Sequence, residues 1–165
     1  MVDATLIDQT ISFSIASKHC RGRAVRLGPV LDEILSAHNY PSNIRDLLAE
    51  AVCLTAMLGS LLKDDESQVT LQAQTEAGVI SLLACDYKNG DLRGYVQFDA
   101  ERLALQPVEP SLMALFGKGY LAITFDQPPP RGRNQGIVPL EGDSLTQAVQ
   151  SYFKQSEQLP TLIVF

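Results

Sequence analysis

The sequence lacks any long apolar run. Its longest charge-free apolar stretch, Ala51–Leu62, covers about 12 residues, whereas a helix that crosses a bilayer needs about 20. Its first residues also lack the basic start, apolar stretch and small-residue cleavage site of a secretory signal. We therefore expect neither a membrane partner nor export.

Cysteine is scarce and scattered. The chain has three cysteines, Cys20, Cys53 and Cys85, whereas a secreted disulfide framework usually has an even number at closer spacing. No Cys-x-Cys or Cys-x-x-Cys pair occurs, and such pairs are the usual signature of a zinc site. The sequence therefore predicts a cytoplasmic protein that holds no metal within this chain.

The usual signatures of catalysis are missing as well. The sequence contains neither a glycine-rich phosphate loop nor a Gly-x-Ser-x-Gly elbow. Its two histidines, His19 and His38, have no Cys, Asp or Glu at a metal-ligand spacing. We expect His38 to end a helix, where a cation is favoured near the free carbonyl groups. We therefore predict no catalytic residue, no cofactor and no enzymatic activity.

The composition is that of a folded and mildly acidic protein. Hydrophobic residues make up 45% of the chain and charged residues 19%, which is typical of a globular domain. The length of 165 residues allows one domain with a substantial core. The formal net charge of -6 argues against nucleic acid as a partner, because phosphate binding needs an excess of Lys and Arg.

A cluster of basic residues leaves one catalytic alternative open. Cys20 lies within this cluster, and neighbouring cations stabilise a thiolate. A reactive Cys20 would indicate a thiol-dependent enzyme; the simpler interpretation is a polar strand edge with an incidental thiol. The cluster has no interleaved aromatic residues, which again argues against nucleic-acid binding. Its members are Lys18, His19, Arg21, Arg23 and Arg26.

The proline-rich segment Pro128–Arg131 allows a further hypothesis, an adaptor that presents this segment to a partner domain. Three prolines form a poor polyproline ligand. A rigid exposed loop is the simpler interpretation.

The first part of the chain predicts two strands followed by two helices. Apolar and polar residues alternate over Ile11–Ile15, which is typical of a half-buried strand. Arg21–Leu27 follows as a second predicted strand, with Arg23 and Ala24 on opposite faces. Helical periodicity covers Val30–His38 and then Pro41–Leu62. The second helix becomes apolar all round beyond Val52, so we expect it to be the central helix of the domain.

The rest of the chain predicts a mainly antiparallel sheet and one further helix. Turn residues around Asn89 and Gly90 separate two strands, as in a tight hairpin. Ser144 and Gln147 have the spacing of a capping box at a helix start. The apolar end Thr161–Phe165 is interpreted as a strand, and we expect the parent polypeptide to continue beyond it. The other strands are expected at 69–75, 79–87, 92–98, 119–126 and 136–140, with a short helix or loop at 107–117.

Several stretches, in order along nearly the whole chain, resemble the redox-regulated heat shock proteins of the 33 kDa chaperonin family. The most specific are GYLAIT and QGIVPLEG, which are Gly119–Thr124 and Gln135–Gly142. The family usually has Arg-Tyr where this chain has Arg133–Asn134, and an Arg where it has Leu162; both differences could alter local strand pairing. The other matching stretches are Arg21–Leu27, Leu31–Leu35, His38–Pro41, Leu58–Lys63, Leu92–Tyr95, Tyr152–Phe153 and Ser156–Thr161.

The resemblance implies an α+β fold, a mostly antiparallel sheet packed against a central apolar helix and further helices. It implies that residues 1–165 are the N-terminal chaperone core domain and that a C-terminal zinc-binding redox-switch domain is absent from this chain. The family activity is that of an ATP-independent holdase, a homodimer that captures unfolding or oxidatively damaged client proteins. Zinc and regulatory disulfide bonds are then expected only in the full-length protein.

The sequence assigns no residue to client binding. A holdase needs exposed apolar surface, and an amphipathic stripe in a sequence is more often core than binding site. Our hypothesis is that the absent switch domain normally covers part of this surface, so that the present chain acts without an oxidant.

Overall fold

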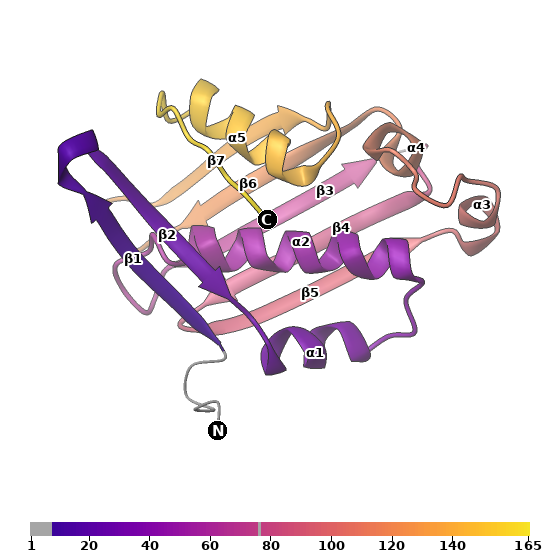
Figure 1. Ribbon diagram of the computed structural model, residues 1–165, viewed down its shortest axis with the longest axis horizontal. Coiled ribbons are helices and arrows are strands. Elements are labelled where there is room, and N and C mark those ends of the chain that lie inside the picture. Colours follow the sequence, from indigo (N-terminus) through magenta and orange to yellow (C-terminus); the bar gives the residue numbers. More distant parts are fainter. Residues whose placement is uncertain (1–7, 76) are drawn as a thin grey trace.

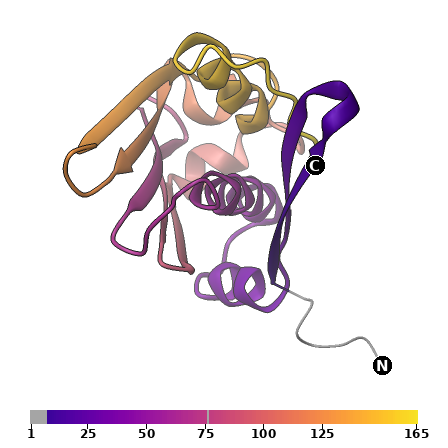
Figure 2. The same cartoon turned by 90° about the vertical axis from the view of Figure 1, so that its left-hand side faces the viewer.

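The computed structural model describes residues 8–165 with the exception of Glu76, and it confirms the α+β fold. Helices lie on one side of a five-stranded antiparallel sheet whose strand order is β5-β4-β3-β6-β7 (Figures 1 and 2). A separate two-stranded hairpin, β1-β2, stands beside the helical layer. Within the described part of the chain no helix has both the length and the hydropathy that a bilayer span requires.

The elements have the following bounds. The strands are β1 (Gln9–Ile15), β2 (Cys20–Arg26), β3 (Gln68–Thr75), β4 (Ile80–Lys88), β5 (Asp91–Phe98), β6 (Gly119–Asp126) and β7 (Arg133–Pro139). The helices are α1 (Pro29–Ser36), α2 (Ser42–Gly59), α3 (Ala100–Ala104), α4 (Leu112–Phe116) and α5 (Leu145–Gln155), and a short 3-10 turn, η2 (Ala16–Lys18), joins β1 to β2.

The centre of the sheet is β3, which pairs with β4 on one side and β6 on the other. The predicted succession of β3, β4 and β5 is confirmed. Asn89 and Gly90 form the two-residue loop between β4 and β5, and both have positive φ, 50° and 89°. That conformation matches the twist of the strands, which is why an Asn-Gly pair closes this hairpin.

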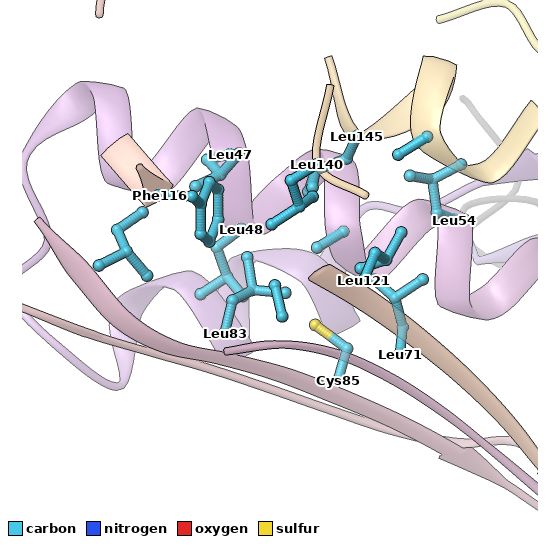
Figure 3. Close-up of a cluster of buried hydrophobic side chains, with 14 of the residues drawn as sticks. Leu47, Leu48, Leu54, Leu71, Leu83, Cys85, Phe116, Leu121, Leu140 and Leu145 are labelled. Atoms are coloured by element: carbon cyan, nitrogen blue, oxygen red, sulfur yellow. The ribbon is translucent and has the colours of Figure 1, made fainter. Parts of the chain in front are cut away.

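The predicted central helix is α2, which crosses the inner face of the sheet (Figure 1). Its residues Ile44 and Leu48 are completely buried, and Figure 3 shows the Cys85 thiol among the leucines of the core. A Cβ atom on Gly94 of β5 would lie 2.7 Å from Cγ2 of Val52. The glycine therefore allows the helix to approach the strand closely.

The N-terminus of α5 is tied to α2 as well as capped. Ser144 Oγ accepts a hydrogen bond from the Gln147 amide, as predicted, while Gln147 Oε1 accepts one from the Asp143 amide. In addition, Glu50 Oε1 on α2 accepts hydrogen bonds from the Thr146 amide (2.8 Å) and hydroxyl (2.6 Å). A carboxylate at a helix N-terminus also complements the helix dipole.

The edge of the sheet at β5 is partly closed by the segment before α2. The Tyr40 hydroxyl accepts a hydrogen bond from the Val96 amide at 3.1 Å. Burial raises the pKa of Tyr40, so this hydroxyl stays protonated. The His38 ring does not bind the end of α1, which stops at Ser36; it contacts the rings of Tyr40 and Tyr95 instead. An edge covered in this way is protected against unwanted strand pairing.

Two predictions about the ends of the chain are wrong. The apolar segment Thr161–Phe165 is not a strand. Its Ile163 is buried, and the Ile163 amide donates to Gln150 Oε1 of α5 rather than to a neighbouring strand. The strand over Ile11–Ile15 is present, but it is not half-buried, because both of its faces are exposed. The short helix α3 was not predicted, and the predicted bounds of the other elements differ by a few residues.

Candidate functional site

The face of the five-stranded sheet that points away from α2 carries an exposed apolar band, which we call the outer sheet face. In register across all five strands lie Tyr95, Ala84, Gln72, Ala122 and Ile137. Five strands at their usual spacing give a band about 19 Å wide. The helices of the described residues lie on the other side of the sheet and do not cover this band (Figure 2).

A second row of the outer sheet face lies beside the first. From β5 to β7 it contains Gln97, Leu82, Gln74, Tyr120 and Pro139. The largest apolar side chains of the two rows are markedly exposed, Tyr95 at 42%, Tyr120 at 61% and Ile137 at 59%. The sheet thus holds these side chains largely in water, although the His38 ring contacts one edge of Tyr95.

Polar side chains occupy the adjoining part of the same face. Asp86 accepts hydrogen bonds from Thr70 (2.7 Å) and pairs with Arg93 (3.1 Å). On the other half of the sheet the Gln135 amide group donates to Thr124 at 2.7 Å. These groups satisfy one another, so the outer sheet face combines apolar side chains on the strands beside β3, glutamines on β3 itself and a hydrogen-bonded polar border.

The β1-β2 hairpin carries a smaller exposed apolar patch, the hairpin face. Ile11, Phe13 and Ile15 project from it, each about half exposed. The Phe13 ring lies across Gly22, where a Cβ atom would come within 2.1 Å of the ring. The hairpin face is therefore ordered within itself but is not buried against the body of the protein.

The structure separates Cys20 from much of its basic cluster. Successive side chains of a strand point to opposite faces, so Arg21 and Arg23 leave β2 on the face opposite Cys20. Cys20 is exposed, and its hydrogen-bond contact is a weak one to the Arg21 carbonyl at 3.9 Å. Among the described residues no histidine or carboxylate contacts this thiol, as a nucleophile with its base would require.

Of the other two thiols, Cys85 is buried, as predicted for a small hydrophobic residue, whereas Cys53 was predicted to be buried and is only partly so. Burial raises the pKa of Cys53 and raises that of Cys85 to about 12. Since the thiolate is the reactive form, a raised pKa lowers the reactivity of both thiols at neutral pH. Across residues 8–75 and 77–165, no group of three or more His, Cys, Asp or Glu residues is arranged to hold a metal ion.

We expect alkylation at neutral pH to distinguish the three thiols. An excess of iodoacetamide should label Cys20 in the folded chain, because it is the exposed cysteine. Cys85 should become labelled only in denaturant, and Cys53, which is partly buried, should be labelled more slowly than Cys20. Peptide mass spectrometry after short and long labelling measures this directly, with the urea-unfolded chain as control. Labelling of Cys85 at the rate of Cys20 would contradict the burial described here.

Sequence reasoning missed the outer sheet face, although one signal for it was present. Strand β6 is apolar on both faces, with Leu121 and Ile123 inward and Tyr120 and Ala122 outward. A strand covered on one side only normally alternates between apolar and polar residues. Tyr120 and Ile137 also lie inside the two most specific stretches of the resemblance, Gly119–Thr124 and Gln135–Gly142.

Comparison with known proteins gives a consistent result. The family model described as Hsp33 protein matches residues 8–165. A 33 kDa chaperonin of Caulobacter vibrioides is 41% identical over 166 residues, which cover 98% of this chain and 54% of the relative. A 33 kDa chaperonin of Escherichia coli O7:K1 is 34% identical over 93% of this chain and 51% of the relative.

A solved structure shares the fold. The crystal structure of the 33 kDa chaperonin (heat shock protein 33 homolog) from Thermotoga maritima superimposes with a TM-score of 0.74 at 23% identity, covering 92% of this chain and 52% of that one. The present chain thus spans about half the length of the curated relatives that it matches.

Proposed function

We propose, on the premise that this chain belongs to the Hsp33 family, that it is the chaperone core of an ATP-independent holdase. In this proposal residues 1–165 form the N-terminal core domain of a longer protein. The relatives are named chaperonins, and a holdase keeps unfolding proteins from aggregating by binding their exposed apolar segments. The observation that carries the proposal is the outer sheet face.

The outer sheet face offers apolar surface whose burial gives a holdase the free energy to bind a client. Burying roughly 250 Å² of apolar surface yields about 6 kcal/mol before the costs of association are subtracted. This driving force is not directional, so it does not select a particular client sequence. The formal charge of -6 helps to keep a loaded complex in solution.

The proposal extends to regulation, although the parts concerned lie outside this chain. We propose that oxidation controls client binding through a C-terminal switch domain that holds zinc when reduced. We also propose that the protein works in the cytoplasm as a homodimer, with unfolded or oxidatively damaged proteins as partners. These points are supported by the family resemblance and by the odd number and wide spacing of the cysteines in this chain.

A light-scattering assay tests the proposed function. A chemically denatured client enzyme is diluted into buffer with or without the 165-residue chain, in the presence of a reducing agent. We expect the chain to suppress aggregation at about equimolar concentration without an oxidant. The control is an unrelated acidic protein of similar size, and equally weak suppression by both proteins would contradict the proposal.

A further inference from the structure

Two hollows meet along the exposed side of α2, between α1, α4 and the start of α5. The larger has a volume of about 640 Å³ and the smaller about 200 Å³. They adjoin one another, because Asp46, Glu50 and Ser144 line both. We call the combined feature the α2 groove.

The α2 groove is apolar at its ends and acidic in the middle. Leu31, Cys53 and Phe165 line the larger hollow at one end. Pro110, Leu112 and Leu115 line the smaller hollow at the other end. The shared middle contains Asp46 and Glu50, with Asp143 beside them in the smaller hollow.

Among the residues that the structure describes, the acidic side chains of the α2 groove form no ion pair. No Lys or Arg lines either hollow, and the ion pairs found among the described residues are Arg93–Asp86 and Arg133–Asp126. Glu50 uses one oxygen, Oε1, for its hydrogen bonds to Thr146. The groove therefore offers uncompensated negative charge between two apolar ends.

The length of the α2 groove fits a short extended peptide. Its lining residues on α2 run from Asn43 to Cys53, a distance of about 15 Å along a helix axis. In an extended peptide, residues i, i+2 and i+4 point to one side and span about 13 Å. Three such side chains match the apolar, acidic and apolar sections of the groove in order.

We propose that the α2 groove binds an extended client segment in which a Lys or Arg is flanked, two residues away on each side, by apolar residues. The cation lies against Asp46 and Glu50, and the apolar side chains enter the two ends. This inference rests on the proposed chaperone function and adds a chemical preference to it. The outer sheet face accepts apolar segments in general, whereas the groove discriminates by charge.

Peptide binding tests this preference. Two fluorescent seven-residue peptides are compared by anisotropy, one with Leu, Lys and Leu at alternate central positions and one with Glu in place of Lys. We expect the Lys peptide to bind roughly fivefold more tightly at low ionic strength. One or two ion pairs that are partly shielded from solvent account for a difference in affinity of this size. The difference should shrink in 0.5 M NaCl, because salt screens the charges.

Matched variants locate the effect. Asp46→Lys should remove or reverse the preference, and Glu50→Gln should weaken it while keeping the acceptor oxygen that binds Thr146. Asp65→Asn is the control, because Asp65 is exposed and lines neither hollow. Thermal unfolding of each variant establishes that the fold is retained.

The outcomes separate this inference from the proposed function. Equal binding of both peptides, or a preference that Asp46→Lys and Asp65→Asn change equally, would overturn the groove inference even if aggregation is still suppressed. Peptide affinity that rises as the protein is diluted would assign the groove to a second copy of this chain and would also overturn it. Loss of aggregation suppression by the unmodified chain concerns the proposed function alone.

Discussion

Replacing Tyr95, Tyr120 and Ile137 together by serine is expected to reduce aggregation suppression more than tenfold, measured as the concentration needed for half-maximal effect. The three side chains supply the largest exposed apolar area of the outer sheet face. Losing roughly 100 Å² of apolar contact costs about 2.5 kcal/mol of binding free energy, which exceeds a factor of ten in affinity. Light scattering with a denatured client measures the change.

The matched control replaces three exposed apolar residues that lie off the sheet, Leu105, Val108 and Met113, by serine. This control variant removes comparable apolar surface but leaves the outer sheet face intact, so its activity should stay within about twofold of the unmodified chain. Both variants should keep their melting temperatures within a few degrees, because substitutions of exposed side chains usually have small effects. Equal losses of activity in the two variants would show that exposed apolar surface in general, and not the outer sheet face in particular, binds the client.

Gly136→Val is expected to lower the free energy of unfolding by about 3 kcal/mol, the upper range for overpacking a filled site. Gly136 of β7 faces α5, and a Cβ atom there would lie 2.1 Å from Cε2 of Tyr152. The Tyr152 ring is buried and its hydroxyl donates to Glu157 at 2.7 Å, so it has no free space in which to move. Urea denaturation followed by circular dichroism measures the loss.

Asn134→Val serves as the control for this substitution. Asn134 lies two residues earlier on β7, on the same side of the strand, but it is exposed. A β-branched residue suits an edge strand, so the change in unfolding free energy should be within about 0.5 kcal/mol. If Gly136→Val changed the free energy of unfolding as little as Asn134→Val, this would contradict the close contact between β7 and α5.

These two predictions meet at β7, through Ile137 and Gly136. On the inner side, Gly136 lets Tyr152 pack against β7, and on the outer side the adjacent Ile137 extends the apolar band. The stretch Gln135–Gly142, which carried much of the family resemblance, thus combines a packing requirement with an exposed surface. The resemblance alone did not distinguish the two roles.

Local signals in the sequence determined much of the architecture. Asn89-Gly90 predicted a tight hairpin, Ser144 and Gln147 predicted a helix start, and the apolar run after Val52 predicted the central helix. The structure confirms all three. Each depends on the conformational preferences or periodicity of neighbouring residues, which a sequence states directly.

What only the tertiary structure decided is which apolar residues remain uncovered. Ile11 and Phe13 alternate like residues of a half-buried strand, yet no described element packs over them. Ile163 of the non-strand tail, by contrast, is buried against α5. The outer sheet face and the α2 groove likewise join residues from strands and helices that are distant in sequence. Periodicity tells which side chains share a face, but exposure depends on whether another element lies against that face, and this is fixed only when the whole chain has folded.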